Sequence, residues 1–169
     1  MAFVWDENVR AAMERLAPIA AKVRTKRLYW IETPDGTLVS NNGFCWCQDC
    51  GSAKVRNLRR HDRKNREDYF LDGGWGSEED GPQFCCCCGV RLRCTLTEHG
   101  AQEEIWHFEE FGLRGGSADD AYEIRECLVA LECRAEEDED AAELAARAVE
   151  IARRFLAEEA NAPSAVEPA

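Results

Sequence analysis

The sequence predicts a mixed α+β fold, and three observations support that expectation. Apolar residues recur at three- and four-residue steps near both ends of the chain, which is the period of an amphipathic helix. Between these ends, apolar and polar residues alternate over short stretches, as they do in a strand with one buried face. Two copies of the pattern Cys-x-x-Cys-Gly lie in the same central region. With 169 residues, of which 45% are apolar, the chain is long enough for one domain that carries a helical appendage.

Residues 1–27 are predicted to form an N-terminal helix, with the regular pattern running over residues 6–26. The apolar positions that share one face are Val9, Ala12, Leu16, Ile19 and Val23. Pro18 lacks a backbone N–H and crowds the preceding turn, so we expect a kink or a break into two short helices there.

Residues 28–116 are predicted to form a β module. The stretch 28–39 contains a Thr-Pro-Asp-Gly tetrapeptide, in which proline and glycine favour a tight turn, so a β-hairpin is expected. Apolar residues alternate with Arg and Thr over residues 90–97, which predicts a strand with one buried face. We expect residues 104–108 to pair back onto that strand through a turn at 98–101, which completes a small antiparallel sheet.

Residues 117–160 are predicted to form an acidic helical hairpin. Ser117 can cap the first helix, and the acidic run at 136–140 suits both the turn and the positive N-terminal end of the second helix. The apolar residues on the inner faces are Ile124, Leu128 and Leu131 in the first helix and Leu144, Ala148, Ile151 and Phe155 in the second. The last residues, 161–169, contain two prolines and no periodic pattern, so a disordered tail is expected.

The two Cys-x-x-Cys-Gly motifs predict one four-cysteine metal site. Two residues between the cysteines let both thiolates of one turn reach a single ion, and the following glycine accepts the left-handed conformation that closes the turn. Four thiolates complete a tetrahedral shell that leaves no position for water, which indicates a structural Zn²⁺ rather than a catalytic one. The predicted ligands are Cys47, Cys50, Cys85 and Cys88.

Other ligands and another metal are alternatives. Side chains near the same turns could replace a predicted ligand or support a second ion, and these are Cys45, Cys86, Cys87 and His61. The remaining cysteines fit buried, unreactive thiols, and these are Cys94, Cys127 and Cys133. Iron or an iron–sulfur cluster is the alternative to zinc, since tetrahedral sulfur ligands suit both.

In the segments FCWCQDCG and QFCCCCGVRLRCTL, the sequence resembles the zinc-ribbon class. The resemblance covers residues 44–97 and implies two cysteine turns on neighbouring β-hairpins. Zinc ribbons occur in transcription factors, ribosomal proteins, polymerase subunits and many small phage and bacterial proteins, so the resemblance implies no single function. The 34 residues between Cys50 and Cys85 exceed what a compact ribbon needs, which indicates an inserted basic and glycine-rich loop at 51–84 and makes a treble-clef variant the alternative.

The insertion contains the only strongly basic stretch of the chain, residues 52–66. Its seven cations are opposed by one acidic residue and are Lys54, Arg56, Arg59, Arg60, Arg63, Lys64 and Arg66. They could contact the phosphates of RNA or DNA, with Tyr69, Phe70 or Trp75 available to stack on bases. Alternatively, the basic stretch could dock on the acidic helices of its own chain or of a second copy in a homodimer, because residues 98–169 carry twenty acidic and six basic side chains.

The sequence favours a non-enzymatic function. Its three histidines, of which His61 is one, have no catalytic spacing. No signal peptide or apolar run of about 18 residues is present, so a cytoplasmic protein without a membrane segment is expected. The leading hypothesis is a zinc-binding adaptor or regulatory protein that binds a protein or nucleoprotein partner. One alternative is an acidic inhibitor that mimics nucleic acid, since the chain resembles phage anti-CRISPR and anti-restriction proteins in size and charge. Another is a zinc-dependent nuclease, because residues 61–65 superficially resemble part of an HNH motif.

Overall fold

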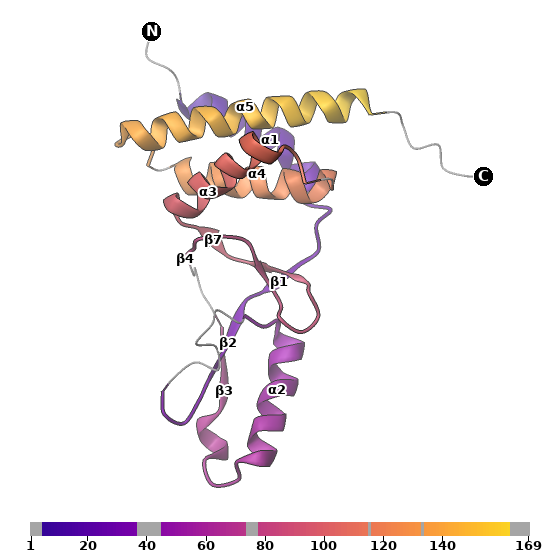
Figure 1. Ribbon diagram of the computed structural model, residues 1–169, viewed down its shortest axis with the longest axis vertical. Coiled ribbons are helices and arrows are strands. Elements are labelled where there is room, and N and C mark those ends of the chain that lie inside the picture. The colour runs from indigo at the N-terminus through magenta and orange to yellow at the C-terminus, as the bar shows by residue number, and fades with distance from the viewer. Residues whose placement is uncertain (1–4, 37–44, 74–77, 115, 133, 163–169) are drawn as a thin grey trace, which may run out of the picture. The chain divides into compact units, whose positions relative to one another are not determined.

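The chain folds into two compact units, each with its own core (Figure 1). This computed structural model describes residues 5–36, 45–73, 78–114, 116–132 and 134–162. The first unit, called the helical unit, comprises residues 1–23 and 96–169, and the second, called the cysteine unit, comprises residues 24–95. The protein combines helices with short strands, as the predicted α+β class requires.

Four described helices build the helical unit. They are α1 (Trp5–Ala20), α3 (Glu98–Phe111), α4 (Ser117–Glu132) and α5 (Glu139–Asn161). Helix α4 packs against each of the other three, and α5 also packs against α1 and α3. The N-terminal helix, which the sequence suggested as a segment of its own, therefore shares one core with the C-terminal pair.

The apolar stripes of the two C-terminal helices face this core. The residues that the sequence places on the inner faces are all buried, and they are Ile124, Leu128, Leu131, Leu144, Ala148, Ile151 and Phe155. Asp138 caps α5, because its side chain accepts a hydrogen bond from the N–H of Asp140 at 2.9 Å. Helix α4 begins one residue earlier than a cap at Ser117 requires, since the carbonyl of Gly116 already accepts a helical hydrogen bond from Asp120.

Helix α1 is not split at Pro18, so of the two expected outcomes, a kink or a break, the break into two short helices is wrong. The helix runs through the proline and ends two residues later, at Ala20. Leu16 and Ala20, on either side of the proline, are both buried in the core. Since Pro18 lies close to the end of the helix, it removes a single hydrogen bond, and the burial of its neighbours offsets that loss.

Residues 98–111 form α3 rather than the predicted turn and strand. Thr97 caps this helix, and its hydroxyl oxygen accepts a hydrogen bond from the N–H of Gly100 at 2.9 Å. The residues that α3 buries recur at helical steps and are Ala101, Ile105 and Phe108. Because these residues are buried on one side of a helix, this segment is helical, and the expected strand at 104–108 is wrong.

The described part of the cysteine unit contains short strands in small sheets. The strands are β1 (Thr25–Arg27), β2 (Tyr29–Glu32), β3 (Phe70–Gly73), β4 (Glu78–Glu79), β5 (Gln83–Phe84), β6 (Arg91–Arg93) and β7 (Thr95–Leu96). Strand β6 lies between β1, to which it is parallel, and β5, to which it is antiparallel. Strands β2 and β3 form an antiparallel pair, and β4 pairs with β7, where the chain passes from one unit to the other.

Only part of the first predicted hairpin lies within the described residues. Its tight turn is present, because the N–H of Gly36 donates to the carbonyl of Thr33 at 2.9 Å and Gly36 has a φ of 76°. The second half of the hairpin, from residue 37 onward, lies outside the described residues, as do Trp75, Cys133 and residues 163–169 of the expected tail. The described partner of β2 is β3, which follows much later in the chain.

Helix α2 (Gln48–His61) occupies a region that the sequence suggested was a loop, and that expectation is wrong. It is followed by a short 3₁₀ helix, η1 (Arg66–Asp68). Helix α2 packs against β2 and β3 and buries Val55. A helix with so few apolar residues has no clear stripe in the sequence, and its packing on the strands stabilises it. Much of the basic stretch is therefore helical.

Candidate metal centre

The first cysteine pair lies at the start of α2. Cys47 is the N-cap residue, with an extended backbone (φ −78°, ψ 161°), and Cys50 lies in the first turn of the helix. The N–H of Gly51 donates to the carbonyl of Cys47 at 2.9 Å. Unpaired backbone N–H groups and the helix dipole at this end favour negatively charged sulfur. The start of α2 therefore suits thiolates that bind a cation.

Gly51 does not close a left-handed turn, which corrects the role that the sequence suggested for it. Among the described glycines, positive φ angles occur at Gly36, Gly89 and Gly112. A Cβ on Gly51 would lie 2.5 Å from Cδ1 of Leu71, the residue of β3 that approaches the helix. Glycine is needed here for close packing between α2 and β3.

The second cysteine pair lies on the kind of turn that the sequence predicted. Residues 85–88 connect β5 to β6, and the N–H of Gly89 donates to the carbonyl of Cys85 at 2.9 Å. Gly89 has a φ of 70°, the left-handed conformation that closes such a turn. The N–H of Cys86 donates to the carbonyl of Cys45 at 3.0 Å, which ties this turn to the segment just before α2.

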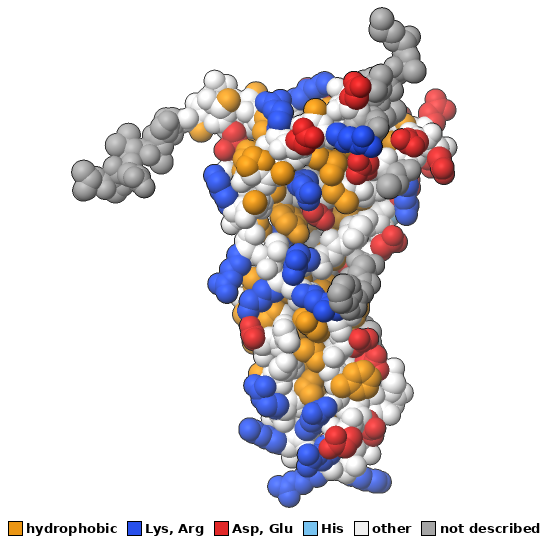
Figure 2. Space-filling model, turned by 180° about the vertical axis from the view of Figure 1, so that it is seen from behind, with side chains coloured by type: hydrophobic (Ala, Val, Ile, Leu, Met, Phe, Trp, Pro, Cys, Tyr) orange, Lys and Arg blue, Asp and Glu red, His pale blue; other side chains and the backbone are white. Residues whose placement is uncertain are grey.

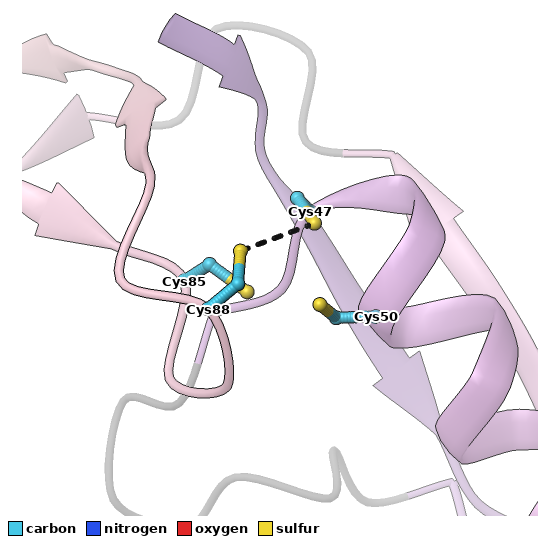
Figure 3. A group of neighbouring side chains, drawn as sticks. All are labelled: Cys47, Cys50, Cys85 and Cys88. Carbon is cyan, nitrogen blue, oxygen red and sulfur yellow. Dashed lines mark hydrogen bonds between the residues drawn. The ribbon is translucent and has the colours of Figure 1, made fainter. Parts of the chain in front are cut away.

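The start of α2 and the turn between β5 and β6 bring the four predicted sulfur atoms together. Figure 3 shows the side chains of Cys47, Cys50, Cys85 and Cys88 pointing toward one another, and their sulfur atoms all lie within 4.8 Å of each other. The Sγ atoms of Cys47 and Cys88 are 3.8 Å apart, far longer than the about 2.0 Å of a disulfide. Four sulfurs at about 2.3 Å from one tetrahedral zinc ion lie about 3.8 Å from each other. The cluster could therefore hold one metal ion.

Two thiols of the cluster have pKa values shifted in opposite directions. Burial, followed by hydrogen bonds with the neighbouring thiols, raises the pKa of Cys50. Burial also acts to raise the pKa of Cys85, but hydrogen bonds from backbone N–H groups, that of Cys88 first, outweigh it and lower this pKa to about 6. One thiolate in the cluster thus makes the next harder to form, since like charges at this distance repel. A bound divalent cation removes that repulsion.

The surroundings of the cluster are apolar on one side and open on the other. Its inner members, Cys47 and Cys85, pack in one buried cluster with Leu28, Cys45 and Leu92. Cys50 is half-buried and Cys88 is exposed. Four sulfur ligands fill a tetrahedral shell, so this arrangement can hold the fold together and has no open position for a substrate.

The other candidate ligands do not join the cluster. Cys45 is buried, its Sγ donates to Oε1 of Gln83 at 3.5 Å, and burial raises its pKa to about 11, so it remains a neutral thiol. Cys86 and Cys87 are exposed. Eleven residues of helix separate His61 from Cys50, which corresponds to about 16 Å along the axis. Within the described residues, the four predicted cysteines are the group that could hold a metal ion.

The cysteines predicted to be unreactive have separate environments. Cys94 is half-buried, and its Sγ lies 4.0 Å from the carbonyl oxygen of Gly81. Cys127 lies in the core of the helical unit, where burial raises its pKa well above the ordinary value. The environment of Cys127 favours the protonated thiol.

The seven basic residues lie on α2 and on the loop that follows it. Arg59 has a structural contact, because its Nε and Nη2 atoms donate to the carbonyl of Tyr69 at 2.9 and 2.6 Å. Four of the seven converge on one hollow of about 450 Å³, and they are Arg59, Arg60, Arg63 and Arg66. The sequence identifies these residues by their charge, but their convergence depends on where α2 ends and the chain turns back toward β3.

Comparisons with protein families, with curated proteins and with solved structures find no match for this chain. Of the two cysteine turns that the zinc-ribbon resemblance implies, only the second is formed as a glycine-closed turn, since the first pair lies at the start of a helix. No helix in the described ranges combines the length and the apolar character that crossing a membrane requires. Function therefore has to be argued from the site itself.

Proposed function

We propose that Cys47, Cys50, Cys85 and Cys88 bind one structural Zn²⁺, and that the zinc-supported unit is a non-enzymatic adaptor for a protein or nucleoprotein partner. The observation that carries this proposal is the convergence of four sulfur atoms within 4.8 Å of one another. Their thiolates fill the coordination shell of the ion, so the ion links segments of the chain and activates no water.

Zinc fits the cluster better than an iron–sulfur cluster does. The 3.8 Å separation between the sulfurs of Cys47 and Cys88 matches ligands of a single tetrahedral ion. A cluster of several iron atoms would hold its cysteine sulfurs further apart than one ion does. Ligands from a helix start and from a glycine-closed turn also favour the treble-clef alternative over the zinc ribbon.

The proposed ion supports a surface rather than a reaction. It would join the start of α2 to the turn between β5 and β6, and so hold in place the helix that carries much of the basic stretch. Structural zinc sites contribute on the order of 10 kcal/mol or more of apparent binding energy to folding. A zinc-supported helix with exposed cations suits an adaptor that recognises a partner by charge.

The metal assignment is tested by elemental analysis of the purified full chain. We expect one zinc per chain in the wild type and in Cys86→Ser, which alters an exposed thiol beside the cluster, and no zinc in Cys50→Ser. Substitution with Co²⁺ should give the intense absorption of a tetrahedral cobalt–thiolate site. Iron, or zinc that persists in Cys50→Ser, would contradict the assignment.

The adaptor function is tested by affinity capture from cells that express the protein, followed by mass spectrometry. The baits are the wild type, Cys50→Ser and the matched control Cys86→Ser. A partner that the wild type and the control retain, and that Cys50→Ser loses, is the expected result. A partner retained equally by all three would contradict a zinc-supported interaction, and hydrolysis of nucleic acid by the wild type would contradict a non-enzymatic function.

A further inference from the structure

Four arginines surround one hollow in the cysteine unit. Arg59 and Arg60 lie in the last turn of α2, whereas Arg63 and Arg66 lie beyond its end. Their side chains line a hollow of about 450 Å³, a size within the range of about 300–1,000 Å³ typical of small-molecule sites. Figure 2 shows Lys and Arg side chains gathered at the end of this unit. The hollow therefore has a strongly positive lining.

Two of these arginines lack an internal role. Arg59 donates to the carbonyl of Tyr69, and Arg66 forms an ion pair with Glu67 at 2.8 Å. Arg60 and Arg63 are exposed and form no ion pair with any residue that the structure describes. Their guanidinium groups are available to a ligand.

Helix stability does not explain the cluster. A cation in the last turn of a helix interacts favourably with the helix dipole, which accounts for Arg60 but not for Arg63 or Arg66. Like charges around one hollow repel each other, and an anion in the hollow would reverse that effect. The arrangement therefore points to an anionic ligand.

The chemistry of the lining indicates which anion fits. The planar guanidinium presents paired N–H donors that match a phosphate, and several such groups around one hollow can contact more than one phosphate oxygen. Among the described residues the hollow is lined by the four arginines, and Phe70, although exposed, is not one of its lining residues. Leu71 approaches α2 at Gly51, and because successive side chains of a strand point to opposite faces, Phe70 lies on the other face of β3.

We infer that the four-arginine hollow binds the phosphate backbone of a nucleic-acid strand. This inference names the chemical class of the proposed partner and rests on the proposed zinc-supported fold. Phosphates are favoured over the carboxylates of an acidic protein because successive phosphates of one strand each carry a negative charge and can occupy several guanidinium groups at once. The binding is independent of base sequence, since phosphates are common to all nucleotides.

The experiment measures the binding of a fluorescent 20-nucleotide oligo(dT) to the full-length, zinc-loaded protein by anisotropy over a range of NaCl concentrations. The site variant is Arg60→Gln with Arg63→Gln. The matched control is Arg153→Gln with Arg154→Gln, which removes the same charge from exposed positions of α5. Zinc content and circular dichroism of each variant show that the fold is retained.

We expect the site variant to weaken binding about tenfold or more at low salt and to lower the slope of log Kd against log salt by about 1.5, because two phosphate contacts are lost. The control should bind as the wild type does.

Three results would overturn the inference. These are no binding of oligo(dT) or oligo(U) by the wild type, an equal loss in the control variant, or binding of polyglutamate as tight as that of the oligonucleotide. Each of them leaves the proposed zinc site and adaptor function standing if the protein still holds one zinc and still captures a zinc-dependent partner. Loss of zinc in the wild-type preparation would instead contradict the proposed function itself.

Discussion

Among the described residues, the helical unit buries one continuous cluster of 23, whereas the corresponding cluster of the cysteine unit has five, of which three are cysteines. The helical unit can thus be stabilised by the hydrophobic effect alone, as ordinary helical proteins are. A cluster of five residues offsets little of the conformational entropy of a 72-residue segment, the length of 24–95. Two parts of one chain can therefore depend on different forces, apolar burial in one and the proposed metal ion in the other.

The cysteines have a double role in this contrast. Cys47 and Cys85 are buried beside Leu28 and Leu92, so they supply apolar contact as well as sulfur for the proposed ion. If the ion is lost, the same residues become neighbouring thiols that compete for protons. The stability of the cysteine unit should therefore depend on metal, and that of the helical unit should not.

Cys50→Ser is the change with the largest expected effect. It should remove the metal and unfold the cysteine unit, because a structural zinc site contributes on the order of 10 kcal/mol or more. Limited proteolysis with mass spectrometry should show cleavage confined to residues 24–95. Cys86→Ser, an exposed neighbour of the cluster, is the control and should resist proteolysis as the wild type does. If Cys50→Ser resists proteolysis equally well, the claim that a metal ion stabilises the cysteine unit is contradicted.

Leu128→Ala tests the claim that apolar burial stabilises the helical unit. This side chain is 0% exposed at the centre of the helical core, so its truncation should lower the free energy of unfolding by about 2–5 kcal/mol. Denaturant unfolding followed by circular dichroism measures the change. The zinc content should stay at the wild-type value, and loss of zinc in this variant would contradict the independence of the two units.

Gly51→Ala sharpens the account of packing around the first cysteine pair. The added Cβ would lie 2.5 Å from Cδ1 of Leu71 and 3.2 Å from Cβ of Trp46, so the Leu71 side chain has to move within this packed contact, at a cost of about 1–3 kcal/mol. Thermal unfolding measures the change, and Gly81→Ala, whose Cβ meets no atom within 4 Å, is the control. The additional change Leu71→Ala should recover part of the loss. A lack of any recovery would show that the crowding is elsewhere.

Glu109→Gln has the smallest expected effect. A hydrogen bond from Arg147 on α5 lowers the pKa of Glu109 on α3 below its ordinary 4.5. This stabilisation is present at neutral pH and is lost as the pH falls through the lowered pKa. Exposed pairs contribute about 0.2–1 kcal/mol, so the variant should be slightly less stable than the wild type at pH 7 and equal to it near pH 3. A difference that persists in acid, measured by urea unfolding, would assign the effect to packing instead.

The sequence predicts those features that depend on neighbours in the chain. The stripes that contain Leu128 and Phe155, the glycine-closed turn at Gly89 and the four convergent cysteines all follow from spacing alone. Helix α2 could not be predicted in this way, because its packing against β2 and β3 stabilises it and its own sequence has few apolar residues. The arginine hollow has the same origin, since it forms only where the helix ends and the chain turns back.

Segment-resolved hydrogen exchange of the full chain, before and after removal of metal with a chelator, tests the central claim most directly. The account predicts that chelation abolishes protection in α2 and in strands β1 to β6 while α4 and α5 keep theirs. Unchanged protection in the cysteine unit after complete removal of metal would contradict the claim that a metal ion holds that unit together.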